Sequence, residues 1–366
     1  MNKWALIVQS QGCSRSHKIA YGLTDLGWTM FLMQQGNRLS TWGFQPYKAI
    51  LSMGSNECDK CWREALNAAT NNKDTFDVIH SSNTPDVYTN HLVVNSKRPV
   101  IHDCHDALTT FNHVDQSTAG YAEALANQRA DGNLFVSEGQ RQYVIDTYNI
   151  DIDKSYVFPN YYLERFATKY PRTKLSDMDG QIHLVWEGGI KMYGEADNQW
   201  ADHRDIWRLF KKLLKQGIHV HVHSSIEFRR GKNRVPLESP NLHWHNPTDL
   251  STLMRVMTQY DAGIVAFNKT NEEFLEHTLP NKMFESFGAG LPVLCDNSRD
   301  VKNWVQKYDV GEPILEGWET GDIEKITFKN INPYISNVEN QKDNWTVEAN
   351  IGGLEKFYEK IAKRGR

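Results

Sequence analysis

Short apolar runs alternate with amphipathic stretches over most of the chain. The first run, Trp4–Val8, is followed by a polar loop around Gly12, by a helical apolar stripe within His17–Leu26 and by a second run at Trp28–Met33. Short apolar runs are typical of parallel strands that are covered on both faces. A strand, a helix and a second strand in this order begin a doubly wound sheet, so the pattern predicts an α/β fold.

Two groups of predicted strands are separated by a polar stretch. The stretch from Asn160 to Gly180 has no apolar period and contains Pro171, as expected of a linker. Further strands are predicted before it at Lys48–Ser52, Asp77–His80, Pro99–His102, Asn133–Ser137 and Tyr156–Phe158. Strands after it are predicted at Ile182–Trp186, Ile218–His223, Asp261–Phe267 and Val293–Cys295, with helices at His203–Leu214, Asp249–Tyr260 and Pro280–Gly288. We therefore expect one Rossmann-like domain in residues 1–165 and a second in residues 180–345.

Composition narrows the class of protein. A chain of 366 residues is too long for one ordinary core, and a net charge of −4 argues against a broad electrostatic hold on nucleic acid. Five scattered cysteines fit a reducing compartment better than a disulfide framework, and we interpret the Cys58–Cys61 spacing as accidental. No leader-like pattern and no apolar run near the ~20 residues of a membrane span stands out. We therefore expect a cytoplasmic protein without a transmembrane segment.

The stretch Leu279–Cys295, LPNKMFESFGAGLPVLC, carries the most specific chemistry. Lys282 and Glu285 are nearly one helical turn apart, so a base and an acid share a face, beside the backbone at Pro280 and Asn281 where the helix begins. A helix N-terminus binds phosphate well. The alternative is a surface helix with a solvated Lys–Glu pair.

This stretch resembles the donor-binding segment of the GT-B glycosyltransferases, specifically the large retaining family with an E-x7-E-like element. The resemblance extends more weakly over almost the whole chain. It implies a GT-B fold, in which two Rossmann-like domains face a central cleft. The first domain is then expected to bind the acceptor and the second the nucleotide sugar, while the C-terminal helix predicted over 346–364 packs back on the first domain. The dinucleotide turn G-x-G-x-x-G is absent from the first loop, which weighs against a dehydrogenase.

The resemblance also implies roles in the donor site. Glu285 is expected to hold the ribose, and Lys282 with the backbone at Pro280–Asn281 to hold the phosphates. The family's basic pair follows the strand that ends before Gly188 and Gly189 and has no intact counterpart here. The nearest candidates are Lys191 and Arg204, the latter placed at a helix start; the alternative is that both are solvated.

Two histidines are expected at the sugar. His277 stands where the family has the first acid of E-x7-E. The segment IHDCHD resembles the family's HD-containing loop, and its His105 is expected to contact the sugar as a neutral imidazole. Gly12 is expected on the donor side, and His102, Asp103 and Asp106 on the acceptor side. Hydrogen-bonded loop caps and then a metal site are the alternatives for this segment.

A third histidine group alternates with valine in one predicted strand. His219, His221 and His223 therefore share a strand face. We favour a polar face that meets a neighbouring loop or helix, with a metal site as the alternative. We predict no metal site and no cofactor besides the nucleotide sugar.

Together these features predict a retaining, metal-independent hexosyl- or pentosyltransferase. Its expected partners are a nucleotide-diphosphate sugar and a hydroxyl acceptor, a glycan being favoured. A nucleotide-sugar epimerase of the same fold, a non-catalytic nucleotide-sugar binding module and transfer to a lipid or a modified nucleic-acid base are the alternatives.

Overall fold

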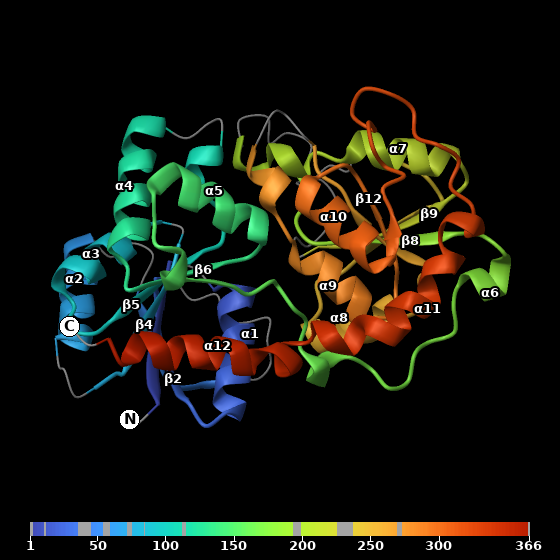
Figure 1. Cartoon of the computed structure of the whole chain (residues 1–366). Helices are drawn as coiled ribbons and strands as arrows, with labels where there is room; N and C mark the ends of the chain where they lie inside the picture. Colours follow the sequence, from blue (N-terminus) through green and yellow to red (C-terminus); the bar gives the residue numbers. More distant parts are fainter. Residues whose placement is uncertain are drawn as a thin grey trace. The chain divides into compact units, whose positions relative to one another are not determined.

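The computed structural model describes residues 3–10, 12–35, 45–53, 59–71, 75–83, 85–111, 115–192, 199–224, 237–268 and 273–364. The chain divides into two compact units, one formed by Met1–Asn160 with Val347–Arg366 and one formed by Tyr161–Thr346. Each unit contains one parallel sheet with helices packed on it (Figure 1). The two sheets confirm the predicted α/β architecture.

The sheet of the first unit has the strand order β3-β2-β1-β4-β5-β6-β7 in the described part of the chain. Its strands are β1 (Trp4–Gln9), β2 (Thr29–Gln35), β3 (Tyr47–Met53), β4 (Val78–Ser82), β5 (Val100–Cys104), β6 (Gly132–Phe135) and β7 (Ser155–Val157). Its helices are α1 (Ser14–Asp25), α2 (Asp59–Thr70), α3 (Val87–Asn95), α4 (Gln116–Arg129), α5 (Glu138–Tyr148) and α12 (Val347–Ala362). Cys58 lies outside the described residues.

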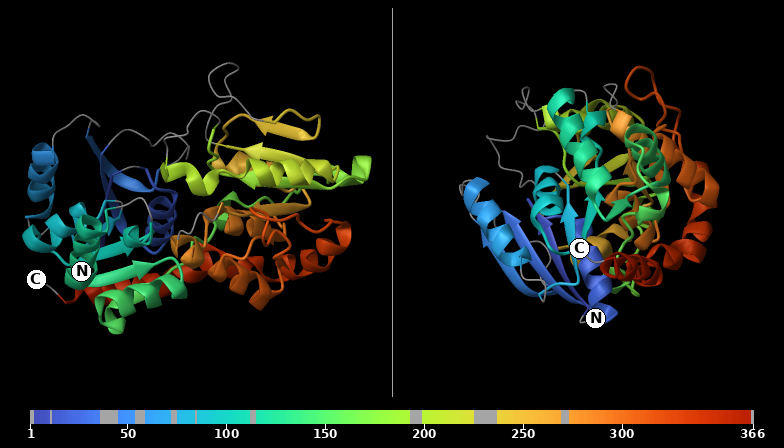
Figure 2. Two further views of the ribbon diagram at one scale, coloured as in Figure 1. Left: turned by 90° about the horizontal axis from the view of Figure 1, so that it is seen from above. Right: turned by 60° about the vertical axis from the view of Figure 1, so that its left-hand side comes forward.

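The C-terminal helix α12 is part of the first unit's core. It lies beside α1, where a Cβ atom on Gly22 would come within 2.7 Å of Ile351 Cγ1, so only glycine permits this close approach. The Tyr358 ring meets Trp28 edge-on with the centroids 5.7 Å apart, and its hydroxyl bonds to His80. Figure 2 shows α12 running alongside this unit from two further directions.

The sheet of the second unit has the order β10-β9-β8-β11-β12-β13. Its strands are β8 (His183–Glu187), β9 (His219–His223), β10 (Leu242–His245), β11 (Ala262–Val265), β12 (Val293–Cys295) and β13 (Gly311–Glu312). Its helices are α6 (Ser176–Asp179), α7 (Trp207–Lys215), α8 (Leu250–Met257), α9 (Asn281–Gly288), α10 (Arg299–Tyr308) and α11 (Asn332–Gln341). Alternate residues of β8 face different layers: Leu184 and Trp186 pack with α7, and Val185 packs with α8.

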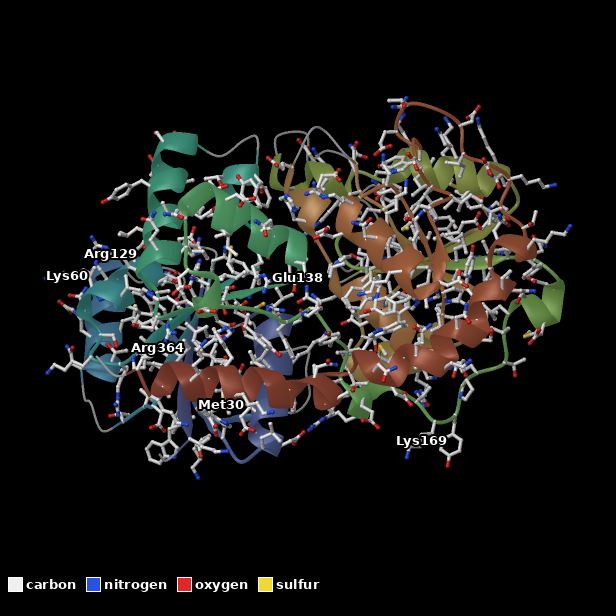
Figure 3. The ribbon with its side chains drawn as sticks, in the orientation of Figure 1. Met30, Lys60, Arg129, Glu138, Lys169 and Arg364 are labelled. Carbon is white, nitrogen blue, oxygen red and sulfur yellow. The ribbon has the colours of Figure 1, made fainter. Side chains whose placement is uncertain are left out.

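Most charged side chains lie at the surface of these units, and most apolar side chains lie inside. Lys60, Arg129 and Lys169 lie exposed, whereas Met30 of β2 is buried (Figure 3). In the described part of the chain, no helix is both long and apolar enough to span a bilayer.

Candidate functional site

Two cations of the second unit meet the glycine pair that follows β8. A Cβ atom on Gly189 would lie 2.9 Å from the Arg204 guanidinium, and one on Gly188 would lie 3.7 Å from the Lys282 ammonium. Gly188 has a φ of +117°, which side-chain-bearing residues rarely adopt. The loop therefore leaves its backbone open to Arg204 and Lys282 at the carboxyl end of β8. In an open parallel sheet this end is where ligands bind.

Lys282 lies in an aromatic environment. Its Nζ atom is 3.2 Å from the centroid of the Trp186 ring and 5.6 Å from that of Phe267. Burial, opposed by the carboxylate of Glu187 and reinforced by the guanidinium of Arg204, lowers the pKa of Lys282 to about 7. With a pKa near 7, Lys282 is only partly protonated at neutral pH, and a dianion that binds beside it favours the charged form.

Helix α9 presents Lys282 and Glu285 as predicted. Met283, Phe284 and Phe287 are fully buried on the face that packs against the unit. Glu285 follows Lys282 by nearly one turn and is 3% exposed. Pro280 caps the helix in an extended conformation, and Asn281 begins it with its backbone N–H in the first turn. Four residues predicted for the donor site, Pro280, Asn281, Lys282 and Glu285, thus lie on one short helix or at its N-terminus.

The two candidates for the basic pair differ in their partners. Lys191 forms an ion pair with Asp202, so its charge is already compensated. Arg204 is exposed and donates from Nε to His203 Nε2 at 3.1 Å. The prediction that Arg204 begins a helix is wrong: it ends a 3-10 helix, Gln199–Arg204, and α7 begins at Trp207. The backbone still joins the two candidates, because Lys191 N–H donates to Arg204 O at 3.1 Å.

His277 lies at the end of a 3-10 helix, Glu273–His277, before α9. Its ring nitrogens are 2.9 and 3.1 Å from Nη2 of Arg299. Burial, with the neighbouring Arg299 charge, lowers the pKa of His277, so the ring is neutral at pH 7. An imidazole is neutral or positively charged, so His277 supplies no negative charge at this position.

In the first unit, Asp103 is the centre of a buried charge cluster. It accepts from Arg15 Nε at 3.0 Å and from His105 Nε2 at 2.9 Å, and His80 Nε2 lies 3.0 Å from its Oδ2 atom. Burial is outweighed by the charges of Arg15 and His105, which hold the pKa of Asp103 well below its usual range. Asp103 is 0% exposed, so its position argues against the predicted direct contact with an acceptor.

Cys13, a residue that sequence reasoning passed over, completes a row with His105 and Asp103. Its Sγ atom is 3.6 Å from His105 Nδ1, and it precedes the first turn of α1. Burial opposes ionisation of both groups, but their mutual attraction lowers the pKa of Cys13 to about 7 and, with Asp103, raises that of His105 to about 10. The expectation of a neutral His105 is therefore wrong. A cysteine directly before a helix was the sequence signal for this low-pKa thiol.

The other residues of this unit that the sequence predicts for the site are His102, Asp106 and Gly12. His102 is 0% exposed and lies 2.9 Å from the Thr89 hydroxyl, so it supports β5 from inside and does not face an acceptor. Asp106 is half-buried, and its backbone oxygen accepts from Asn83 Nδ2 at 2.6 Å. Gly12 is exposed beside Cys13.

Comparisons with solved structures identify the fold. No family model matches the sequence, and no curated protein matches it. HepE of Anabaena in complex with UDP-glucose is 14% identical, with 98% of each chain covered and a TM-score of 0.61. The α,α-trehalose 6-phosphate synthase of Burkholderia multivorans is 9% identical, covering 100% of this chain and 98% of its own, with a TM-score of 0.64. UGT89C1 of Arabidopsis thaliana, complexed with UDP-L-rhamnose, is 10% identical over 99% of both chains, with a TM-score of 0.59. The chain has the GT-B fold of the glycosyltransferases.

Proposed function

We propose that the protein is a retaining glycosyltransferase that transfers a sugar from a nucleoside diphosphate to a hydroxyl acceptor. The observation that carries this proposal is the convergence of Lys282 and Arg204 on the Gly188–Gly189 loop, with Glu285 on the same helix as Lys282. A nucleoside diphosphate leaves as a polyanion, so cations and helix N–H groups fixed in place lower the barrier to its departure.

Each residue of the second unit then has a defined task. Glu285 accepts hydrogen bonds from the ribose hydroxyls. Lys282, Arg204 and the backbone at Asn281 hold the diphosphate, and neutral His277 lies near the sugar. Lys191 positions Asp202 and the turn that carries Arg204. UDP is the proposed nucleotide, since HepE and UGT89C1 were solved with UDP-sugars.

No residue is assigned as a general base. In retention by front-face attack, the departing phosphate oxygen takes the proton of the acceptor hydroxyl, and the new glycosidic bond forms on the face that the leaving group vacates. His105, charged and fixed by Asp103, is proposed as the first unit's contact with the sugar. No metal is assigned to this reaction, and a glycan hydroxyl is the proposed acceptor.

The test is product analysis with UDP-glucose, UDP-galactose and UDP-N-acetylglucosamine, each with mono- and oligosaccharide acceptors. The proposal predicts release of UDP and a new glycoside whose anomeric configuration by NMR equals that of the donor. A new nucleotide sugar without free UDP would indicate an epimerase instead. Binding of the donor without any turnover, with every acceptor tried, would indicate a non-catalytic module. Glu285→Ala should lose turnover while keeping the circular dichroism spectrum of the wild type.

A further inference from the structure

Six histidines line one face of the second unit's sheet, on the three strands at its β10 edge. They are His183 on β8, His219, His221 and His223 on β9, and His243 and His245 on β10. The valines between them on β9 belong to the core that packs with α7, so the imidazoles project from the opposite face.

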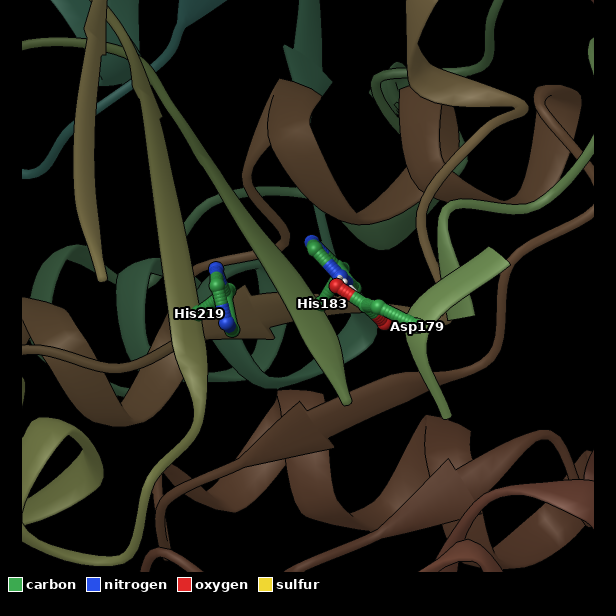
Figure 4. Close-up of side chains that lie close together, drawn as sticks. All are labelled: Asp179, His183 and His219. Carbon is green, nitrogen blue, oxygen red and sulfur yellow. Dashed lines mark hydrogen bonds and ion pairs between the residues drawn. The ribbon is translucent and has the colours of Figure 1, made fainter. Parts of the chain in front are cut away.

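We call these six residues the histidine ladder. Its end at the start of β8 and β9 brings together side chains of the kinds that bind metals. One ligand atom each from Asp179, His183 and His219 lies within 4.8 Å of the others. His183 Nε2 is 3.0 Å from the Asp179 carboxylate, and His219 Nε2 is 3.2 Å from Gln181 Oε1. Asp179 ends α6 and points toward His183, with His219 on the neighbouring strand (Figure 4). The two Nε2 atoms therefore face the side on which Asp179 and Gln181 lie.

The other nitrogen of each prospective ligand is already held. His183 Nδ1 is 2.9 Å from His221 Nε2, and His219 Nδ1 is 2.9 Å from His243 Nε2. His221 in turn bonds through Nδ1 to His245 Nε2 at 3.1 Å. Before a cation binds, the Asp179 carboxylate can only accept, so His183 Nε2 carries the proton that faces it. When a cation takes the Nε2 lone pair, the proton is carried on Nδ1 instead, and Nδ1 of His183 and of His219 then donates to His221 and His243. Histidines that bind metals show this arrangement, because the outer hydrogen bond fixes the tautomer and the ring orientation.

We propose that Asp179, His183 and His219 form a binding site for a late first-row divalent cation, represented by Zn²⁺. Two imidazoles and a carboxylate suit Zn²⁺ and its neighbours in the series, whereas Mg²⁺ and Ca²⁺ prefer oxygen ligands. Bond lengths of about 2.0–2.2 Å place the ligands of tetrahedral Zn²⁺ roughly 3.3 Å apart, so closing the site moves these side chains by about 1 Å. Asp179 is partly exposed and has the freedom to do so.

The cation would tie α6 and the start of β8 to β9, and it is separate from the proposed donor site. His183 begins β8, and Gly188 follows its last residue. Five residues of extended chain span roughly 16 Å. The ion is therefore assigned a structural task, and loss of the ion leaves the groups at Gly188, Arg204 and Lys282 unchanged.

The test is equilibrium dialysis of the EDTA-treated full chain against Zn²⁺, with Co²⁺ absorption as a second readout. The proposal predicts one ion per chain, the intense visible bands of four-coordinate Co²⁺ and a higher thermal midpoint with Zn²⁺. Asp179→Asn, His183→Gln and His219→Gln should each weaken binding about 100-fold or more, and His243→Gln about tenfold through the outer hydrogen bond. Asp179→Asn is the decisive variant should the buried His183 be needed for folding.

His91→Gln provides the matched control, since His91 is a half-buried histidine of the first unit that bonds to Asn67. It should bind Zn²⁺ as the wild type does. Absence of stoichiometric Zn²⁺ binding, or binding that is unchanged in Asp179→Asn and His219→Gln, would overturn the proposal. UDP binding by Asp179→Asn is expected to equal that of the wild type, which keeps this test independent of the proposed function.

Discussion

Replacing Lys282 with methionine should stabilise the second unit while weakening the binding of nucleoside diphosphates. Methionine has a similar length and can remain against the Trp186 ring, which Lys282 Nζ approaches to 3.2 Å. The charge and its cation–π contact with the Trp186 ring are lost. The variant therefore separates two effects of the charge, which are the loss of stability of the folded chain and the gain in affinity for a ligand.

The magnitude follows from the pKa of Lys282, which falls from 10.5 in the unfolded chain to about 7. At about 1.36 kcal/mol per pKa unit this difference has an upper bound of about 5 kcal/mol, and local solvation reduces the expected gain to on the order of 2 kcal/mol. The folded protein releases a proton that the unfolded chain keeps between these two pH values. The advantage of methionine is thus greatest below pH 7 and vanishes as the pH rises towards 10.5.

Urea denaturation of both proteins at pH 6, 8 and 10 measures this gain, and calorimetry with UDP measures the loss of affinity. One charge-assisted hydrogen bond to phosphate is worth about 1.5–3 kcal/mol, so binding should weaken roughly 10- to 150-fold. Lys302→Met is the control, because half-buried Lys302 pairs with exposed Glu316 on the surface of the same unit; it should alter neither quantity noticeably. A Lys282→Met protein that is less stable at every pH and binds UDP normally would refute the reasoning.

Three further predictions concern other groups. Glu285→Gln should weaken UDP binding by about tenfold or more by calorimetry, because an amide replaces a charged acceptor of the ribose hydroxyls; equal affinities would remove Glu285 from the site. Alkylation of Cys13 by iodoacetamide, followed by mass spectrometry, should rise with a midpoint near pH 7, and His105→Ala should move that midpoint upward; an unchanged midpoint would exclude the ion pair. Asp103→Asn should destabilise the chain by about 3–5 kcal/mol in urea, because it leaves buried Arg15 uncompensated; a loss below about 1 kcal/mol would contradict this.

Helices and strands of this fold could be predicted from local sequence patterns, because each element depends on a few neighbouring residues. The strand predicted at Val293–Cys295 is β12, and the strand predicted at Trp4–Val8 is β1 with one more residue. Helix α9 was recognisable because Pro280 and the glycines after it set its ends and its apolar residues share a face. The start of α7 was missed. Ile206 fits the apolar pattern of the helix although it precedes the helix, and the residues before it form a separate 3-10 helix.

Contacts between distant segments could not be predicted in the same way. The pairing of Arg15 with Asp103 spans 88 positions and depends on the first turn of α1 coming within reach of Asp103 on β5, which no periodicity encodes. When the pairing with Arg15 is unknown, the position of Asp103 at the end of a predicted strand indicates a contact with a ligand. The histidine ladder likewise depends on β8, β9 and β10 being neighbours, because their registers decide which imidazoles meet.

The central claim is that the second unit binds a nucleoside diphosphate through Glu285 and the two cations. Calorimetric titration of the wild type and of Glu285→Ala with UDP, GDP, ADP, CMP and dTDP tests it most directly. The account predicts selective binding of one nucleoside diphosphate, UDP being expected, and its loss in the variant. Absence of binding by every nucleotide, or equal binding by both proteins, would contradict the account.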